Sequence, residues 1–256
     1  MVEFALKDLD GLWWLLLVLG PFLLFQRRLH LEVQSVLLLL VRRSDISLAL
    51  FSLLFFPGVL LHESSHYLMA RVLGVRTGRF SLIPRPLNDG RLQLGYVETA
   101  KADFLRDALI GLAPLLTGGV FVAYAGLARL GLPAIWDSMS VNGAQYFSQA
   151  VQGLLGHSDF WLWFYLIVAV SSTMMPSRAD RRAWLPVVLA AVFLLGLGLL
   201  AGAGPWLLQN FAAPLNTAMR AVAIVFIISL GVHMILVLPF LFLRKILERL
   251  TGYHVV

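Results

Sequence analysis

The segment His62-Glu63-Ser64-Ser65-His66 has the residue types and the spacing of a zinc site. Histidines four residues apart lie on one face of an α-helix, so their imidazoles can bind the same metal ion. A glutamate directly after the first histidine can act as a general base toward water at the metal. We therefore expect His62 and His66 to bind Zn²⁺ and Glu63 to transfer protons.

The motif lies inside a long apolar segment, residues 46–73, which is long enough to form a membrane-spanning helix. A charged side chain at the centre of a bilayer costs roughly 2.5–3.5 kcal/mol on insertion scales, so ionisable groups in such helices usually serve a function. The alternative is a polar cluster at a helix end near the lipid headgroups, without a metal. The placement favours the metal site.

The composition is that of an integral membrane protein. Hydrophobic residues make up 59% of the 256 residues and charged residues only 13%, whereas soluble proteins contain about 25% charged residues. We therefore predict an all-α polytopic membrane protein with about six transmembrane helices. The apolar segments are residues 12–25, 46–70, 106–128, 158–176, 183–204 and 219–243.

Three further features of the composition limit the possible functions. The absence of cysteine excludes disulfides, thiolate ligands and a cysteine nucleophile. The formal net charge is +6, but the basic residues lie between apolar segments, which indicates contact with anionic lipid rather than with nucleic acid. Residues 33–41 are apolar but too short to span, so we expect an interfacial or tucked-in segment there.

Residues 74–100 have a strand-like composition that differs from the segments around them. Asn88-Asp89-Gly90 is a strong turn signal between apolar runs at 79–83 and 91–97, and it predicts a β-hairpin or a small sheet. The hairpin either only links two helices or offers an edge strand to extended substrate beside the metal.

The distribution of basic residues predicts the orientation. If the helix that carries the motif ends in the cytoplasm, 14 of the lysines and arginines fall on the cytoplasmic side and 6 on the other. The larger group includes the basic residues of the C-terminus, and the smaller group includes the four arginines between residues 27 and 43. We therefore expect a multi-pass protein of the cell membrane, with the hairpin and the active site toward the cytoplasmic side.

A catalytic zinc site has three protein ligands and one open position, so a third ligand must come from elsewhere in the chain. The candidates are Glu98, His157, Asp159, Asp180 and His233. Asp180 follows a predicted span at the depth of His66, whereas His157 and Asp159 fall at the opposite face. The alternative for Asp180 is a surface carboxylate paired with one of the arginines beside it.

The order of these features resembles the site-2 protease family of intramembrane zinc metalloproteases. The resemblance covers residues 46–182 and consists of the motif, a hairpin, a span with Gly111 and Pro114, and a proline-containing segment that leads to Asp180. In that family a second motif, Asn-x-x-Pro-x-x-x-x-Asp-Gly, supplies the third ligand, and the resemblance assigns this role to Asp180.

The chain departs from the second motif at three positions. Ser172 stands where the family has Asn, and Arg181 stands where it has Gly. Pro176 is four residues before Asp180, one residue closer than in the family. Residues 183–256, two additional C-terminal helices and a short cytoplasmic tail, follow the metalloprotease-like core of residues 46–182. Residues 1–45 precede that core as an N-terminal anchor and interfacial segment.

The resemblance implies a zinc-dependent endopeptidase that cleaves transmembrane proteins or peptides within or next to the bilayer. His62, His66 and Asp180 would hold the zinc, and Glu63 would take a proton from water and pass it to the leaving amine. One alternative is an inactive homologue that binds metal and membrane proteins, against which the intact Glu63 argues. Another is a metal transporter, against which the absence of an internal repeat argues.

Overall fold

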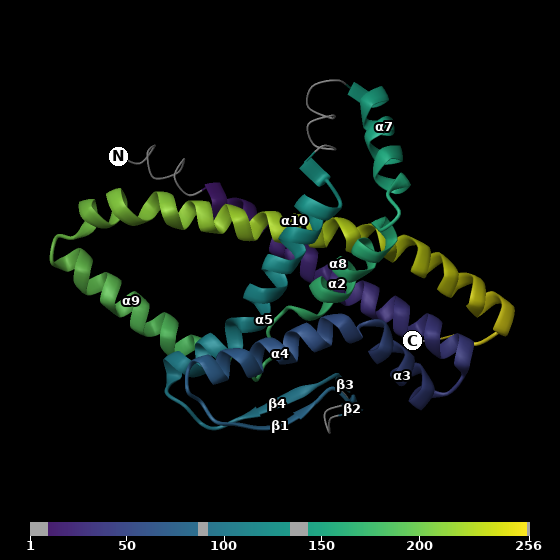
Figure 1. Ribbon diagram of the computed structural model, residues 1–256, viewed down its shortest axis with the longest axis horizontal. Helices are drawn as coiled ribbons and strands as arrows, with labels where there is room; N and C mark the ends of the chain where they lie inside the picture. The colour runs from purple at the N-terminus through teal and green to yellow at the C-terminus, as the bar shows by residue number, and fades with distance from the viewer. Residues whose placement is uncertain (1–9, 87–91, 134–142, 255–256) are drawn as a thin grey trace.

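A computed structural model describes residues 10–86, 92–133 and 143–254, and this part of the chain is mainly helical (Figure 1). The helices are α2 (Asp10–Val41), α3 (Ser44–Leu54), α4 (Phe56–Val72), α5 (Phe104–Tyr124), α7 (Gly143–Gly156), α8 (Phe160–Thr173), α9 (Trp184–Leu200) and α10 (Gly204–Thr251). A π-helical turn, Ala125–Arg129, extends α5. The strands are β1 (Thr77–Ser81), β2 (Arg85–Pro86), β3 (Leu92–Gln93) and β4 (Tyr96–Thr99).

The lengths and compositions of these helices confirm a helical membrane protein. Helices α2, α10 and α5 with its π-helical turn are each long and apolar enough to span a bilayer. Helices α3 and α4 together meet the same criterion, but they are bent by 68° relative to each other. Helices α8 and α9 are apolar but shorter, with 14 and 17 residues.

Residues 33–41 do not form a separate interfacial segment, because they continue α2 without a break to Val41. The buried side chains of Val33, Val36 and Leu39 extend the apolar face of this helix. The charge of Glu32 is paired inside the protein with Arg28, at 2.7 Å, and with Arg244 of α10, at 2.6 Å. A neutralised carboxylate allows the helix to continue where the sequence alone indicates a boundary.

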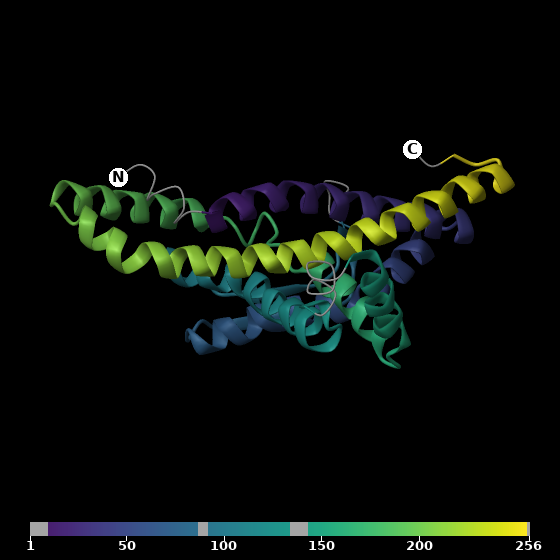
Figure 2. The same ribbon diagram turned by 90° about the horizontal axis from the view of Figure 1, so that it is seen from above.

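Helices α2 and α10 run parallel, side by side, over most of the length of α2 (Figure 2). Asp10 pairs with Arg220 near the N-terminal end of α2, and Glu32 pairs with Arg244 near the other end, each at 2.6 Å. Beyond that end, the guanidinium of Arg42 lies 5.2 Å from the ring centre of Tyr253. Arg42 and Arg43 therefore lie at the same end of this helix pair as the C-terminal basic residues, and Arg27 and Arg28 lie in the half of α2 that leads to that end.

This arrangement corrects the basic-residue count, which placed those two groups on opposite sides. The count assumed that the segments 183–204 and 219–243 cross one after the other. Instead, α9 leaves the start of α5, and α10 returns from the far end of α9 at an angle to it, so that the two form an arm that extends past the N-terminal end of α2 (Figure 1). No side chain of α9 is buried.

The predicted hairpin is present and lies along α4 (Figure 1). Strand β1 pairs antiparallel with β4, with Phe80 opposite Val97 and an irregularity between Thr77 and Phe80. Strands β2 and β3 form a second short antiparallel pair. The predicted turn at residues 88–90 lies outside the described residues.

The parallel packing of α2 and α10 predicts a labelling pattern. Cysteines introduced at Ser44 and at Arg249, both exposed at the common end of the two helices, should react with a membrane-impermeant maleimide from the same side. The natural chain has no cysteine, so each variant reports a single position. The measurement compares labelling of intact cells with labelling of inverted vesicles, and reaction of the two positions from opposite sides would contradict the parallel pair.

Candidate metal centre

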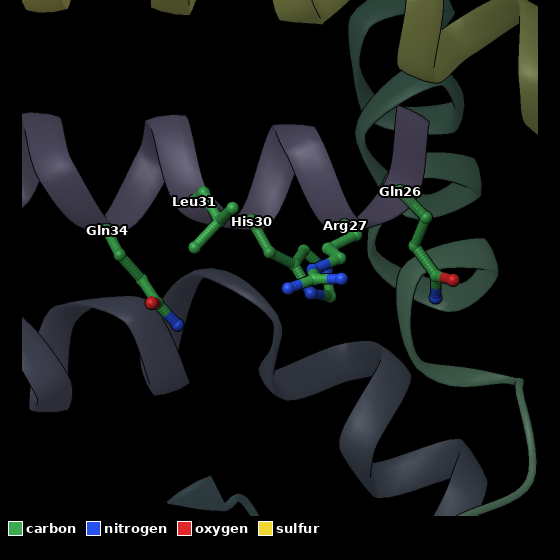
Figure 3. A pocket seen from close by; sticks show the side chains of 5 residues that line it. All are labelled: Gln26, Arg27, His30, Leu31 and Gln34. Carbon is green, nitrogen blue, oxygen red and sulfur yellow. The ribbon is translucent and has the colours of Figure 1, made fainter. Parts of the chain in front are cut away.

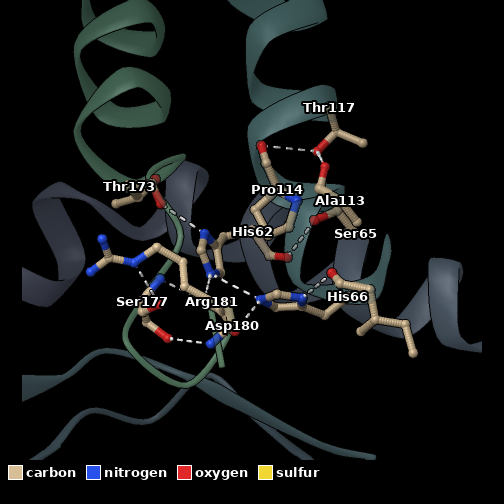
Figure 4. A network of polar contacts seen from close by, with 11 residues as sticks. His62, Ser65, His66, Ala113, Pro114, Thr117, Thr173, Ser177, Asp180 and Arg181 are labelled. Carbon is tan, nitrogen blue, oxygen red and sulfur yellow. Dashed lines mark hydrogen bonds and ion pairs between the residues drawn. The ribbon is translucent and has the colours of Figure 1, made fainter. Parts of the chain in front are cut away.

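The structure brings His62, His66 and Asp180 together at one point between α4, α5 and the loop after α8 (Figure 4). The two Nε2 atoms are 3.1 Å apart, and Nε2 of His66 is 3.3 Å from Oδ1 of Asp180. Nε2 of His62 is 3.9 Å from Oδ2 of Asp180. Two tetrahedral zinc ligands with bonds of about 2.0–2.1 Å lie about 3.3 Å apart, so the spacing of the imidazoles suits one ion.

Both histidines are oriented by hydrogen bonds from their other ring nitrogen. Nδ1–H of His62 donates to the carbonyl of Thr173, at 2.7 Å, and Nδ1–H of His66 donates to the carbonyl of Ile110, at 2.8 Å. A carbonyl only accepts, so in each neutral ring Nε2 carries the lone pair. Two lone pairs and a carboxylate that face each other at this distance fit a bound cation, with the carbonyls as supporting partners of the ligands.

Both of these carbonyls lack a partner within their own helix. Thr173 is the last residue of α8, and the final carbonyls of a helix have no N–H ahead of them. Ile110 is four residues before Pro114, which has no N–H to donate to it. The proline of α5 and the end of α8 thus each leave a carbonyl free to accept from a histidine of the candidate site.

Glycines allow the helices that carry these groups to approach closely. A Cβ atom at Gly58 of α4 would collide with the carbonyl of Ala169 and the hydroxyl of Thr173 on α8. A Cβ atom at Gly111 of α5 would collide with the backbone carbonyl of Asp180. Small residues at helix contacts permit such backbone approach in membrane proteins. These contacts set the distance from α4 to α8 and from α5 to the loop of Asp180.

Asp180 is held in place by a local hydrogen-bonded loop. Its Oδ2 accepts from the backbone N–H of Ser177, at 2.7 Å, and its own N–H donates to the Ser177 hydroxyl, at 3.3 Å. Burial alone would raise the pKa of Asp180, but the contact with His66 and the hydrogen bonds with Ser177 outweigh it and hold this pKa below its ordinary value. The side chain is therefore a carboxylate, the form that binds a metal.

The surface salt bridge considered for Asp180 is not found. Arg182 pairs instead with Asp107 of α5, at 3.1 Å, and Nε of Arg181 donates to the carbonyl of Ser177. Within residues 10–86, 92–133 and 143–254, no arginine forms an ion pair with Asp180. In the same residues, His62, His66 and Asp180 are the one cluster of three side chains that could bind a metal ion together.

The other candidate ligands lie elsewhere. Asp159 begins α8, at the opposite end of that helix from the site, and its pKa is lowered by hydrogen bonds from Trp163 and Arg129. His157 precedes it. Glu98 accepts from the backbone N–H of Arg79 at the exposed face of the sheet. His233 is buried on α10, where its ring bonds to Ser172 and Ser229.

Glu63 is buried on α4 beside the first ligand and lies against the sheet. A Cβ atom at Gly95, which directly precedes β4, would lie 2.8 Å from Cγ of Glu63 and 3.1 Å from the carbonyl of Ser81. Sequence reasoning missed this contact. The available signal was an isolated glycine inside a strand-like segment, which indicates that another group approaches the backbone closely.

Comparisons with models of known protein families, with curated protein sequences and with solved structures found no match for this chain.

Removal of the proposed third ligand should abolish stable metal binding. Asp180→Ala takes away the only carboxylate oxygen within reach of both Nε2 atoms among the described residues, so zinc per purified protein should fall close to zero. Arg181→Ala is the control, because the hydrogen bond of this exposed side chain within the described part of the protein goes to the carbonyl of Ser177 and surface interactions are worth about 0–1 kcal/mol. Full zinc occupancy in Asp180→Ala, with a normal thermal melt, would remove Asp180 from the site.

Pro114→Ala should weaken zinc binding without destabilising the protein. The substitution restores a backbone N–H that competes with His66 for the carbonyl of Ile110. Loss of a supporting partner of a ligand typically costs about 10–100-fold in metal affinity, whereas removal of a proline from a helix interior relieves strain. Pro239→Ala in α10 is the matched control. An unchanged zinc affinity in Pro114→Ala would show that the free carbonyl is not needed.

Proposed function

We propose that this protein is a membrane-embedded zinc endopeptidase that cleaves peptide bonds within or next to the bilayer. One observation carries the proposal: Glu63 is buried directly beside a three-ligand site without being one of the ligands. A site that only stored or sensed metal has no need for an additional carboxylate at this position. The resemblance of residues 46–182 to site-2 proteases supports the same reaction.

Zinc, when bound by His62, His66 and Asp180, would supply a Lewis acid that activates water and polarises a carbonyl. The protein's own residues would handle the proton. Glu63 takes a proton from the attacking water and later gives it to the leaving amine nitrogen. The carbonyls of Thr173 and Ile110 hold the two imidazoles so that neither ring turns its N–H toward the site.

The position of the sheet favours an extended peptide as substrate. A helix has its backbone groups paired internally, so a transmembrane substrate must unwind before a peptide bond is accessible. The sheet of β1 and β4 contacts α4, and Gly95 brings its backbone against Glu63. A substrate strand added at the edge of this sheet would have its backbone paired beside the general base.

We also propose that the C-terminal end of α4 faces the cytoplasm in a multi-pass protein of the cell membrane. After the correction for α10, residues 71–106 and 178–182 still contribute ten basic residues at this end, against seven in residues 27–43 and 244–249. The active site then opens toward the cytoplasmic side.

Glu63→Gln should retain zinc and lose cleavage, because the amide keeps the shape of the side chain but cannot accept the proton. General acid–base groups typically contribute about 10²–10⁴-fold to rate. The assay co-expresses each variant with a panel of tagged single-span membrane proteins and follows their fragments. Glu248→Gln, a partner of Arg244 far from the site, is the control. Wild-type cleavage by Glu63→Gln would refute the catalytic role, and zinc binding without cleavage in the wild type would favour an inactive metal-binding homologue.

A further inference from the structure

The last turn of α8 is held from two sides by helices that contribute no zinc ligand. The hydroxyl of Ser172 contacts Nε2 of His233 on α10, at 2.9 Å. The carbonyl of Ser172 accepts from Nε2 of Gln26 on α2, at 2.7 Å. Gln26 points toward α8 from a face of α2 that lines a cavity of about 320 Å³ (Figure 3). The next carbonyl along the chain, that of Thr173, orients His62.

The direction of the hydrogen bond between Ser172 and His233 follows from the other ring nitrogen. Nδ1–H of His233 donates to the carbonyl of Ser229, at 2.7 Å. In the neutral ring, Nε2 then accepts the proton of the Ser172 hydroxyl. The neighbours of Ser172 behave differently, because Ser171 and Thr173 donate their hydroxyls to carbonyls within α8. The hydroxyl of Ser172 thus bonds to another helix, while the hydroxyls of its two neighbours bond within α8.

His233 is fully buried, and its ring meets that of Phe22 edge-on at 5.5 Å. A polar ring at this position in an apolar helix is energetically costly, and such groups in membrane helices usually serve a function. One of its ring nitrogens bonds within α10, to Ser229, and the other bonds to Ser172 in the C-terminal turn of α8. That turn ends in the free carbonyl that holds His62, so a short series of contacts connects His233 to a candidate ligand.

We propose that His233 and Gln26 are positioning residues of the zinc site. They fix the hydroxyl and the carbonyl of Ser172, and thereby the direction of the Thr173 carbonyl that sets the orientation of His62. The inference rests on the proposed zinc site but not on peptide cleavage. In this chain a serine stands where the site-2 protease motif has asparagine, and the contact with His233 gives that serine a specific role.

The primary test compares Ser172→Ala with Ser171→Ala. Both side chains are buried on the same turn, and each variant loses one hydroxyl, but only Ser172 donates to another helix. Zinc affinity is measured by competition with a chromophoric chelator, and stability by thermal melt. Ser172→Ala should bind zinc about 10–100-fold more weakly, and Ser171→Ala should bind it as the wild type does. Equal affinities in the two variants would overturn the proposal.

The second test replaces the two positioning side chains. His233→Leu and Gln26→Leu should both weaken zinc binding, and His233→Gln should restore most of it, because the amide oxygen can accept from Ser172. His30→Leu controls for loss of a buried imidazole, since Nε2 of His30 has no partner among the described residues. Normal zinc affinity in His233→Leu, or an equal loss in His30→Leu, would contradict the proposal. Wild-type protein that binds zinc but cleaves nothing would contradict the proposed function and leave this inference standing.

Discussion

Two hydrogen bonds from imidazole N–H groups to backbone carbonyls determine the geometry of the candidate metal centre. They direct Nε2 of His62 and His66 toward Asp180, and they tie the two candidate ligands on α4 to α8 and to α5. A helix normally uses its carbonyls internally, so such bonds require carbonyls that have lost their partner. Here the end of α8 and the proline of α5 supply them. The site therefore depends on where two other helices are interrupted.

The same constraint explains the close packing around the site. A hydrogen bond of 2.7–2.8 Å between a side chain and a neighbouring helix leaves little tolerance in the position of that helix. Gly58 and Gly111 remove the side chains that would hold α4 away from α8, and α5 away from the loop of Asp180. Residues that pack helices and the candidate metal ligands thus depend on each other, because a change of backbone spacing would move the imidazoles and the carboxylate relative to one another.

The sequence predicted features that depend on the spacing of nearby residues, but it did not predict contacts between residues that are far apart in the chain. The helical positions of His62, Glu63 and His66 follow from their spacing, and the hairpin follows from its turn signal. Asp180 could be chosen by chain order. The carbonyl partners could not be predicted by residue type, because every residue has a carbonyl. Glu32 suggested a boundary because its partner Arg244 is 212 residues away, and the parallel packing of α2 and α10 is a tertiary property of the same kind.

The parallel arrangement of α2 and α10 has a consequence for the path of the chain through a bilayer. Helices that run in the same direction at the beginning and the end of a chain require an odd number of crossings. Among the described residues, α2, α5 with its π-helical turn and α10 each have the length and composition of a span, and the bent pair α3 and α4 together would make a fourth. Where α2 and α10 both span a bilayer, their common direction places the beginning of α2 and the end of α10 on opposite faces of it.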